Sequence, residues 1–142
     1  MSVTKLNHIG IIVSDLEAAI LKYQEVLGVK LDRIEDYGAG LLRIAFFPLG
    51  EILLELIQPL RPGSTAWDFL QEHGEGIEHL AFQVDDIAAE CSRLIRENIP
   101  VADWAPRAGA GKTQICFLKR EALCGVLGEF VTEGDCSETG SV

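Results

Sequence analysis

The chain has 142 residues and a formal net charge of −10; 48% of its residues are hydrophobic and 24% are charged. This length suits one domain with a buried core, and the composition is that of a soluble globular protein. The acidic balance argues against nucleic-acid binding, which depends on Lys and Arg at the phosphates, and no apolar stretch approaches the roughly 18 residues of a membrane span.

The first half of the chain predicts one strand, one helix and three further strands. The first strand, about 6–13, begins so close to the N-terminus that we expect no secretion signal and a cytoplasmic protein. Ser14-Asp15-Leu16-Glu17 has the capping-box pattern of a helix start, and apolar residues follow at helical spacing until Gly28. Three short strands are expected at about 29–35, 41–49 and 51–58.

A linker with its own short helix follows the first half. It opens with Pro59-Leu60-Arg61-Pro62-Gly63, and the helix is expected at about 65–73. Ser64 or Thr65 would cap this helix at its start, and Gly74 would end it.

The second half repeats the order of elements of the first. A strand at about 77–84 leads into a helix that starts at Asp85 or Asp86 and stops near Asn98 and Pro100. Three short strands follow at about 101–104, 113–119 and 125–132. The sequence therefore predicts an α+β fold of two tandem βαβββ modules, whose sheets curve around a shared cleft.

We expect these modules to form a single domain over residues 1–142. Module 1 would occupy about 5–59, the linker and short helix 60–75, module 2 about 76–132, and a frayed polar tail 133–142.

Each half carries one histidine and one glutamate at matching places. The segment Leu6-Asn7-His8-Ile9-Gly10 returns as Ile77-Glu78-His79-Leu80-Ala81, so His79 follows His8 at an offset of 71 residues. Glu55 stands alone in one apolar strand and Glu129 in the matching one, at an offset of 74 residues. The duplication predicts that two imidazoles and two carboxylates meet around a pseudo-twofold axis.

Such a cluster has simpler interpretations when each residue is taken alone. A single histidine in an apolar strand is usually a hydrogen-bonded core residue, and a buried glutamate can pair with a nearby arginine. Duplication favours a metal site, and we predict that His8, Glu55, His79 and Glu129 bind a divalent ion. Oxygen and imidazole donors suit Co2+, Mn2+, Ni2+ or Zn2+. Two open positions would accept a substrate with two oxygens. The third histidine, His73, has no repeat partner, and we expect it to be exposed.

Positive charge gathers in one stretch of the second half, although the whole chain is acidic. The stretch contains Arg107, Lys112, Lys119 and Arg120. We interpret it as a place where a small anionic ligand could be held.

Several of these segments resemble the vicinal oxygen chelate (glyoxalase/bleomycin resistance/dioxygenase) superfamily and, within it, the methylmalonyl-CoA epimerases. The matching segments are His8–Ile11, Phe47–Gly50, Glu55–Leu60, Gly74–Phe82, Val84–Ile87, Gly109–Lys112 and Gly125–Phe130. The resemblance implies that His8, Glu55, His79 and Glu129 are the metal ligands. It also implies a homodimer that interconverts the C2 epimers of methylmalonyl-CoA, or of a related CoA thioester.

In such an enzyme Glu129 would remove the C2 proton, and Arg107 and Lys112 would meet the phosphates of CoA. Arg43 stands where these relatives place a second acid, so the second proton donor is unassigned; Glu35, Asp36 and Glu51 are nearby in sequence. Glu78 replaces a histidine that many relatives carry.

Two other functions are compatible with the same residues. A glyoxalase I-type lactoylglutathione lyase would use the same metal and Glu129 as base, with Arg43 holding a glutathione carboxylate. A non-catalytic member of the superfamily would bind a small molecule without turnover.

Overall fold

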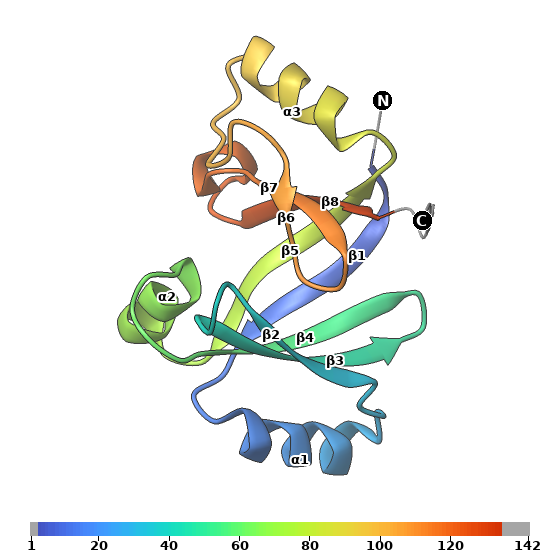
Figure 1. Ribbon diagram of the computed structural model, residues 1–142, viewed down its shortest axis with the longest axis vertical. Coiled ribbons are helices and arrows are strands. Elements are labelled where there is room, and N and C mark those ends of the chain that lie inside the picture. The colour runs from blue at the N-terminus through green and yellow to red at the C-terminus, as the bar shows by residue number, and fades with distance from the viewer. Residues whose placement is uncertain (1–2, 135–142) are drawn as a thin grey trace, which may run out of the picture.

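The computed structural model describes residues 3–134, whose eight strands form one curled sheet (Figure 1). Module 1 consists of β1 (Val3–Ile12), α1 (Leu16–Leu27), β2 (Arg33–Tyr37), β3 (Leu42–Leu49) and β4 (Ile52–Pro59). The linker helix is α2 (Thr65–His73). Module 2 consists of β5 (Gly76–Val84), α3 (Ile87–Arg96), β6 (Arg107–Ala108), β7 (Thr113–Phe117), the 3-10 helix η1 (Arg120–Leu123) and β8 (Leu127–Glu133). The predicted α+β fold of two βαβββ modules is confirmed.

The sheet has the same pairing in both halves, so its centre is a pseudo-twofold axis. The strand order is β2-β3-β4-β1-β5-β8-β7-β6. Within each module the first strand pairs in parallel with the last, β1 with β4 and β5 with β8. The modules join through the antiparallel pair β1 and β5, in which His8 lies opposite Ala81 and Gly10 opposite His79. The two histidines are therefore brought to neighbouring positions on the central strands.

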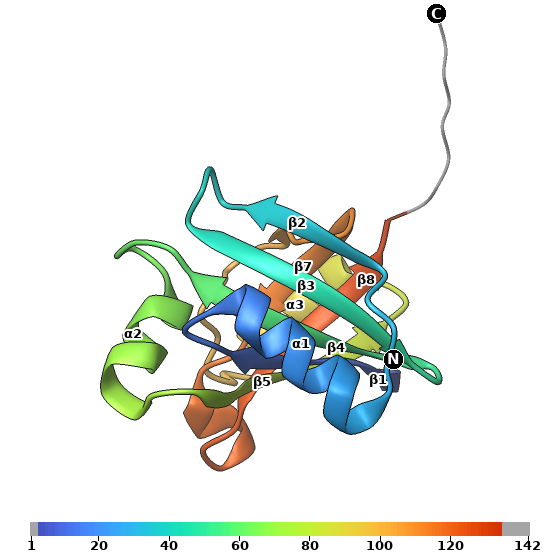
Figure 2. The same ribbon diagram turned by 90° about the horizontal axis from the view of Figure 1, so that it is seen from below.

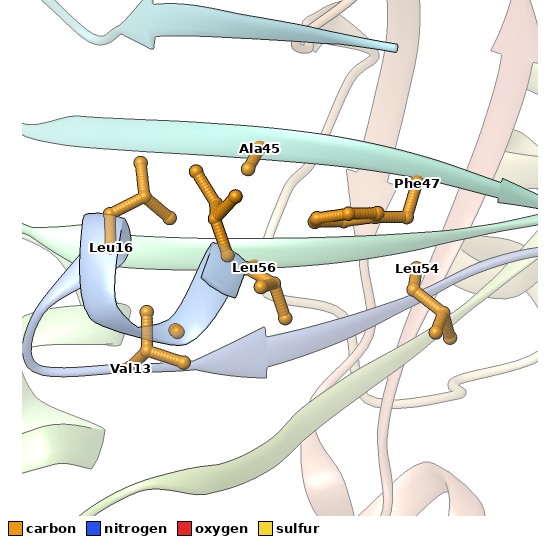
Figure 3. Packing of buried hydrophobic residues seen from close by; sticks show 8 residues of the cluster. Val13, Leu16, Ala45, Phe47, Leu54 and Leu56 are labelled. Carbon is orange, nitrogen blue, oxygen red and sulfur yellow. The ribbon is translucent and has the colours of Figure 1, made fainter. Parts of the chain in front are cut away.

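Each module buries one face of its strands under its own long helix. In Figure 3, Val13 and Leu16 pack with Ala45, Phe47 and Leu56, and Figure 2 shows α1 lying along this face. A second cluster lies beneath α3 in module 2. Because side chains alternate along a strand, the other face of each module is left for a cleft.

The helix boundaries follow the signals in the sequence, with one shift. Asp15 caps α1 by accepting a hydrogen bond from the Ala18 amide, so the cap is one residue later than the capping box predicted. Ser14 instead donates its amide to Glu75. Gly28 ends the helix with a φ of 66°, the left-handed conformation that glycine adopts at low cost.

Two predicted strands are wrong in their placement. Residues 29–32 form no strand, and β2 begins only at Arg33. In module 2 the segment 101–104 makes one isolated bridge, at Val101, and the edge strand is the short β6. The Asp103 carboxylate accepts the Phe117 amide hydrogen, so a side chain takes the place of a backbone partner there.

The curled sheet brings its two edge strands into contact. Tyr37 on β2 donates its hydroxyl hydrogen to the carbonyl of Ala108 on β6, at 2.6 Å. The Glu35 carboxylate on β2 accepts the Gly111 amide hydrogen, at 2.9 Å. These bonds close the open side of the sheet around the cleft.

None of the helices within residues 3–134 is long and apolar enough to span a membrane. Most of the predicted tail, from residue 135 on, lies outside the described residues.

Candidate metal centre

Paired irregularities in the central strands aim the site residues into the cleft. The register between β1 and β5 skips Asn7 on one strand and Glu78 on the other, so each is the extra residue of a β-bulge. A bulge lets consecutive side chains face the same side of a sheet. Asn7 and His8 therefore line the cleft together, as do Glu78 and His79.

Three ligand atoms from three strands converge at the pseudo-twofold axis. The Nε2 atoms of His8 and His79 are 3.2 Å apart. Oε2 of Glu129 lies 3.1 Å from Nε2 of His79 and 3.6 Å from Nε2 of His8. Ligands bound at about 2.1 Å around one ion are separated by about 3.0–3.4 Å. Two sides of the triangle fall in this range, and the third, between His8 and Glu129, is slightly longer. His8, His79 and Glu129 are all buried.

The partners of the Nδ1 atoms, on the side of each imidazole away from the triangle, also indicate a metal site. Nδ1 of His8 lies 2.8 Å from the amide oxygen of Asn7, and Nδ1 of His79 lies 2.9 Å from a carboxylate oxygen of Glu78. Both neighbours are acceptors, so each Nδ1 carries a hydrogen and each Nε2 presents its lone pair when the ring is neutral. Two such lone pairs and a carboxylate oxygen facing one another call for a cation. The residues present therefore fit a divalent ion.

Glu55 reaches this cluster from a different side. Its Oε2 lies 3.1 Å from Nδ1 of His8, and it does not belong to the group of converging ligand atoms formed by His8, His79 and Glu129. In the structure Glu55 supports His8 rather than facing the centre of the triangle. Its role as a fourth ligand stays a prediction.

Gly10 makes room for His79. A methyl group at Gly10 would lie only 2.1 Å from Cε1 of the His79 ring and within 2.6 Å of both ring nitrogens. Such distances are far below van der Waals contact, so the imidazole occupies space that only glycine leaves free on the neighbouring strand.

Burial and mutual contact shift the pKa values of the cluster. Burial alone raises the pKa of Glu129, but hydrogen bonds with His79 and His8 outweigh it and lower that pKa to about 2. Burial alone lowers the pKa of His79, but hydrogen bonds to Glu129 and Glu78 raise it to about 10. Burial raises the pKa of Glu55, partly offset by the nearby His8. Without an ion, His79 is therefore protonated, and its imidazolium pairs with the Glu129 carboxylate.

The cluster lies in the wall of a cavity of about 610 Å³, lined mainly by apolar side chains. Among the predicted substrate-binding residues, Arg107 and Lys112 line it. Arg33 lines it too, and the sequence analysis missed this residue. Arg33 stacks on Phe46, 3.9 Å from the ring centroid, and Arg107 lies over Phe117 at 5.5 Å. The offset between the two arginines is 74 residues, as for the two glutamates, and could have revealed Arg33.

Arg43 lies outside this cavity. Its neighbours Leu42 and Ile44 line the cavity, so the alternation of side chains turns Arg43 to the other face of β3. Its exposed guanidinium is 3.6 Å from the Asp36 carboxylate. His73 is exposed, as predicted.

The candidate second acids named from the sequence are also absent from the lining. Glu35 is held by Arg33 and the Gly111 amide, Asp36 is exposed, and Glu51 is in the exposed turn between β3 and β4. The carboxylates that line the cavity are those of Glu55, Glu78, Glu129 and Glu133.

Comparison with known proteins agrees with this architecture. Uncharacterized protein YqjC of Bacillus subtilis (strain 168) is 34% identical over 125 residues, which cover 88% of this chain and 89% of that protein. The ethylmalonyl-CoA/methylmalonyl-CoA epimerase of Cereibacter sphaeroides is 33% identical, covering 88% of this chain and 95% of the relative. A solved structure of methylmalonyl-CoA epimerase in complex with methylmalonyl-CoA and NH4+ superimposes with a TM-score of 0.89 and 30% identity, covering 94% of this chain and 97% of that one.

The model of the Glyoxalase/Bleomycin resistance protein/Dioxygenase superfamily matches residues 7–117. This match includes both histidines and Glu55 and ends before β8, which carries Glu129. It agrees with the resemblance seen in the sequence. The chain belongs to the glyoxalase/bleomycin resistance protein/dioxygenase superfamily.

Proposed function

We propose that this protein is a metal-dependent isomerase that interconverts the C2 epimers of methylmalonyl-CoA or of a related CoA thioester. The observation that carries the proposal is the buried triangle of His8, His79 and Glu129 in the wall of a large cleft. The epimerase relatives support the choice of reaction.

In this proposal His8, His79 and Glu129 hold the ion, with Glu55 as the fourth ligand. Bound there, a Co2+, Mn2+, Ni2+ or Zn2+ ion would supply Lewis acidity to substrate oxygen atoms. An ion bound there would take the place of the proton that His79 otherwise carries and, as a cation, would keep Glu129 ionised.

Glu129 is the proposed base for the C2 proton, because it is the cleft carboxylate that lies next to both imidazoles. Returning a proton on the opposite face requires a second group. The other carboxyl groups that line the cavity are Glu55, Glu78 and Glu133.

The walls of the cavity suit an acyl-CoA. Apolar side chains such as Ile44, Ile57 and Ile115 face the cavity and would pack against the acyl group. Arg107 and Lys112 line the same cavity and would attract phosphate groups.

Deuterium exchange tests this proposal directly. Co2+-loaded protein would be incubated with one epimer of methylmalonyl-CoA in D2O, and C2 deuteration followed by NMR. We expect deuterium at C2 and formation of the second epimer. Glu129→Gln should abolish both, while His73→Ala, which changes an exposed histidine outside the site, should retain them.

The same preparations separate the alternatives. Conversion of the glutathione hemithioacetal of methylglyoxal without C2 exchange of the CoA thioester would identify a lactoylglutathione lyase. Ligand binding without turnover of either substrate would identify a binding protein. Either result would contradict the proposed epimerase.

A further inference from the structure

Glu78 is the polar residue in the site whose place the proposed reaction does not explain. It occupies the β-bulge of β5, as Asn7 occupies the matching bulge of β1. The offset between the two residues is 71, the offset between His8 and His79. Both contact Nδ1 of the histidine that follows them, but one is a neutral amide and the other a carboxylate.

Asn7 and Glu78 differ in how many of their side-chain polar atoms have hydrogen-bond partners. The Asn7 amide donates to Gln83 at 3.0 Å and to Glu133 at 3.4 Å, so both ends of its side chain have partners. The Glu78 side chain is only 4% exposed, and one oxygen lies 2.9 Å from His79. Its other oxygen, Oε2, is the single buried side-chain nitrogen or oxygen in residues 3–134 without a hydrogen-bond partner.

The buried part of the cleft carries several carboxylates and few cations to balance them. Glu55, Glu78 and Glu129 are buried together, and none forms an ion pair with a lysine or arginine in the described part of the chain. A buried carboxylate without a compensating charge is costly. A divalent ion beside the Nε2 atoms of His8 and His79 would offset the excess negative charge of these carboxylates.

The two histidines also depend on different supports. Nδ1 of His8 has two acceptors, Asn7 and Glu55. Nδ1 of His79 has Glu78 alone among the described residues. A carboxylate that accepts the Nδ1 hydrogen fixes the tautomer and orientation of a ligating histidine and makes Nε2 a stronger donor.

We propose that Glu78 is a positioning residue that holds His79 toward the cation and sets the affinity of the site for that ion. The inference rests on the proposed metal site and adds a residue that does not itself contact the ion. It also gives a role to a carboxylate that is buried with one oxygen unpaired.

Competition for Co2+ between the protein and a chromophoric chelator tests the inference without reference to catalysis. Glu78→Ala removes both the charge and the acceptor and should weaken Co2+ binding by about 10- to 100-fold. Glu78→Gln keeps an acceptor for the Nδ1 hydrogen but loses the charge, so its loss of affinity should be smaller. The visible spectrum of bound Co2+ should shift in both variants, because the donor strength of His79 changes.

Glu90→Gln is the matched control. Glu90 is as buried as Glu78, but it lies on α3 and pairs with Arg93 outside the cleft. The Glu90→Gln protein should bind Co2+ as the wild type does. If Glu78→Gln and Glu78→Ala both bind Co2+ within twofold of the wild type with an unchanged spectrum, the inference is wrong, although the metal site stands. If the wild type itself binds no Co2+, both the metal site and the role of Glu78 are overturned.

Discussion

Substituting Gly10 with alanine should destroy the metal site while leaving its ligands in the sequence. The added methyl group would lie 2.1 Å from Cε1 of His79, whereas carbon atoms pack at about 3.5 Å or more. The buried imidazole must therefore retreat by more than about 1 Å, which exceeds the roughly 0.2 Å tolerance of a metal–ligand bond. We expect Co2+ affinity to fall at least about 100-fold. Crowding should also lower the free energy of unfolding by about 1–3 kcal/mol.

Isothermal titration with Co2+ and thermal unfolding of the metal-free protein measure the two effects separately. Ala81→Gly is the matched control, because Ala81 is the repeat equivalent of Gly10 and lies opposite His8. Removing that methyl group should destabilise the fold by about 1 kcal/mol and leave Co2+ affinity within a few fold of the wild type. A Gly10→Ala protein that binds Co2+ as tightly as the wild type would refute the reasoning.

Three further predictions follow from the same contacts. Because the folded pKa of His79 is raised from 6.5 to about 10, its contribution to stability is complete below pH 6.5 and is lost as the pH rises through 10. Thermal unfolding of the metal-free protein should therefore show decreasing stability between these values, and a flat profile would contradict the assignment. Between pH 6.5 and 10, Co2+ affinity should rise by up to about tenfold per pH unit, because the ion must displace the His79 proton. Calorimetry in buffers of different ionisation enthalpy should detect the release of about one proton for each ion bound. Tyr37→Phe removes the hydrogen bond to Ala108 that joins the sheet edges. It should cost about 0.5–1.5 kcal/mol in urea unfolding, and no loss would show that this bond does not hold the edges together.

The architecture could be predicted from the sequence because the repeat is visible both in the order of the secondary-structure elements and in the spacing of the histidines and glutamates. Polar caps, stop signals and apolar strands recur in both halves, and the offsets between histidines and between glutamates place them on equivalent strands. The short strand β6 was not predictable. Pro100 and Pro106 bracket the segment where regular pairing was expected, and the Asp103 side chain, not a backbone carbonyl, accepts the Phe117 amide hydrogen.

The arrangement of the site was only partly predictable. That His8, His79 and Glu129 converge follows from the repeat, but the place of Glu55 does not. Glu55 and Glu129 lie opposite Gly10 and Ala81 on equivalent strands. Even so, one faces Nδ1 of His8 and the other both Nε2 atoms. Strand register, which is equivalent for the two residues, does not encode this difference in side-chain direction.

Bulges explain why the partners of the histidines were missed. Regular alternation would turn the residue before each histidine to the opposite face of the sheet. The register shifts at Asn7 and Glu78 instead turn them into the cleft. A polar residue before the histidine in both halves was the available signal.

Anomalous diffraction from crystals soaked in Mn2+ or Co2+ tests the central claim most directly. We predict one anomalous peak per chain, within about 2.0–2.3 Å of Nε2 of His8, Nε2 of His79 and a carboxylate oxygen of Glu129; a fourth bond to Glu55 would establish the full predicted ligand set. A peak that contacts only one of the two histidines, or no peak between them at full soaking, would contradict the claim that the two modules build a single metal centre.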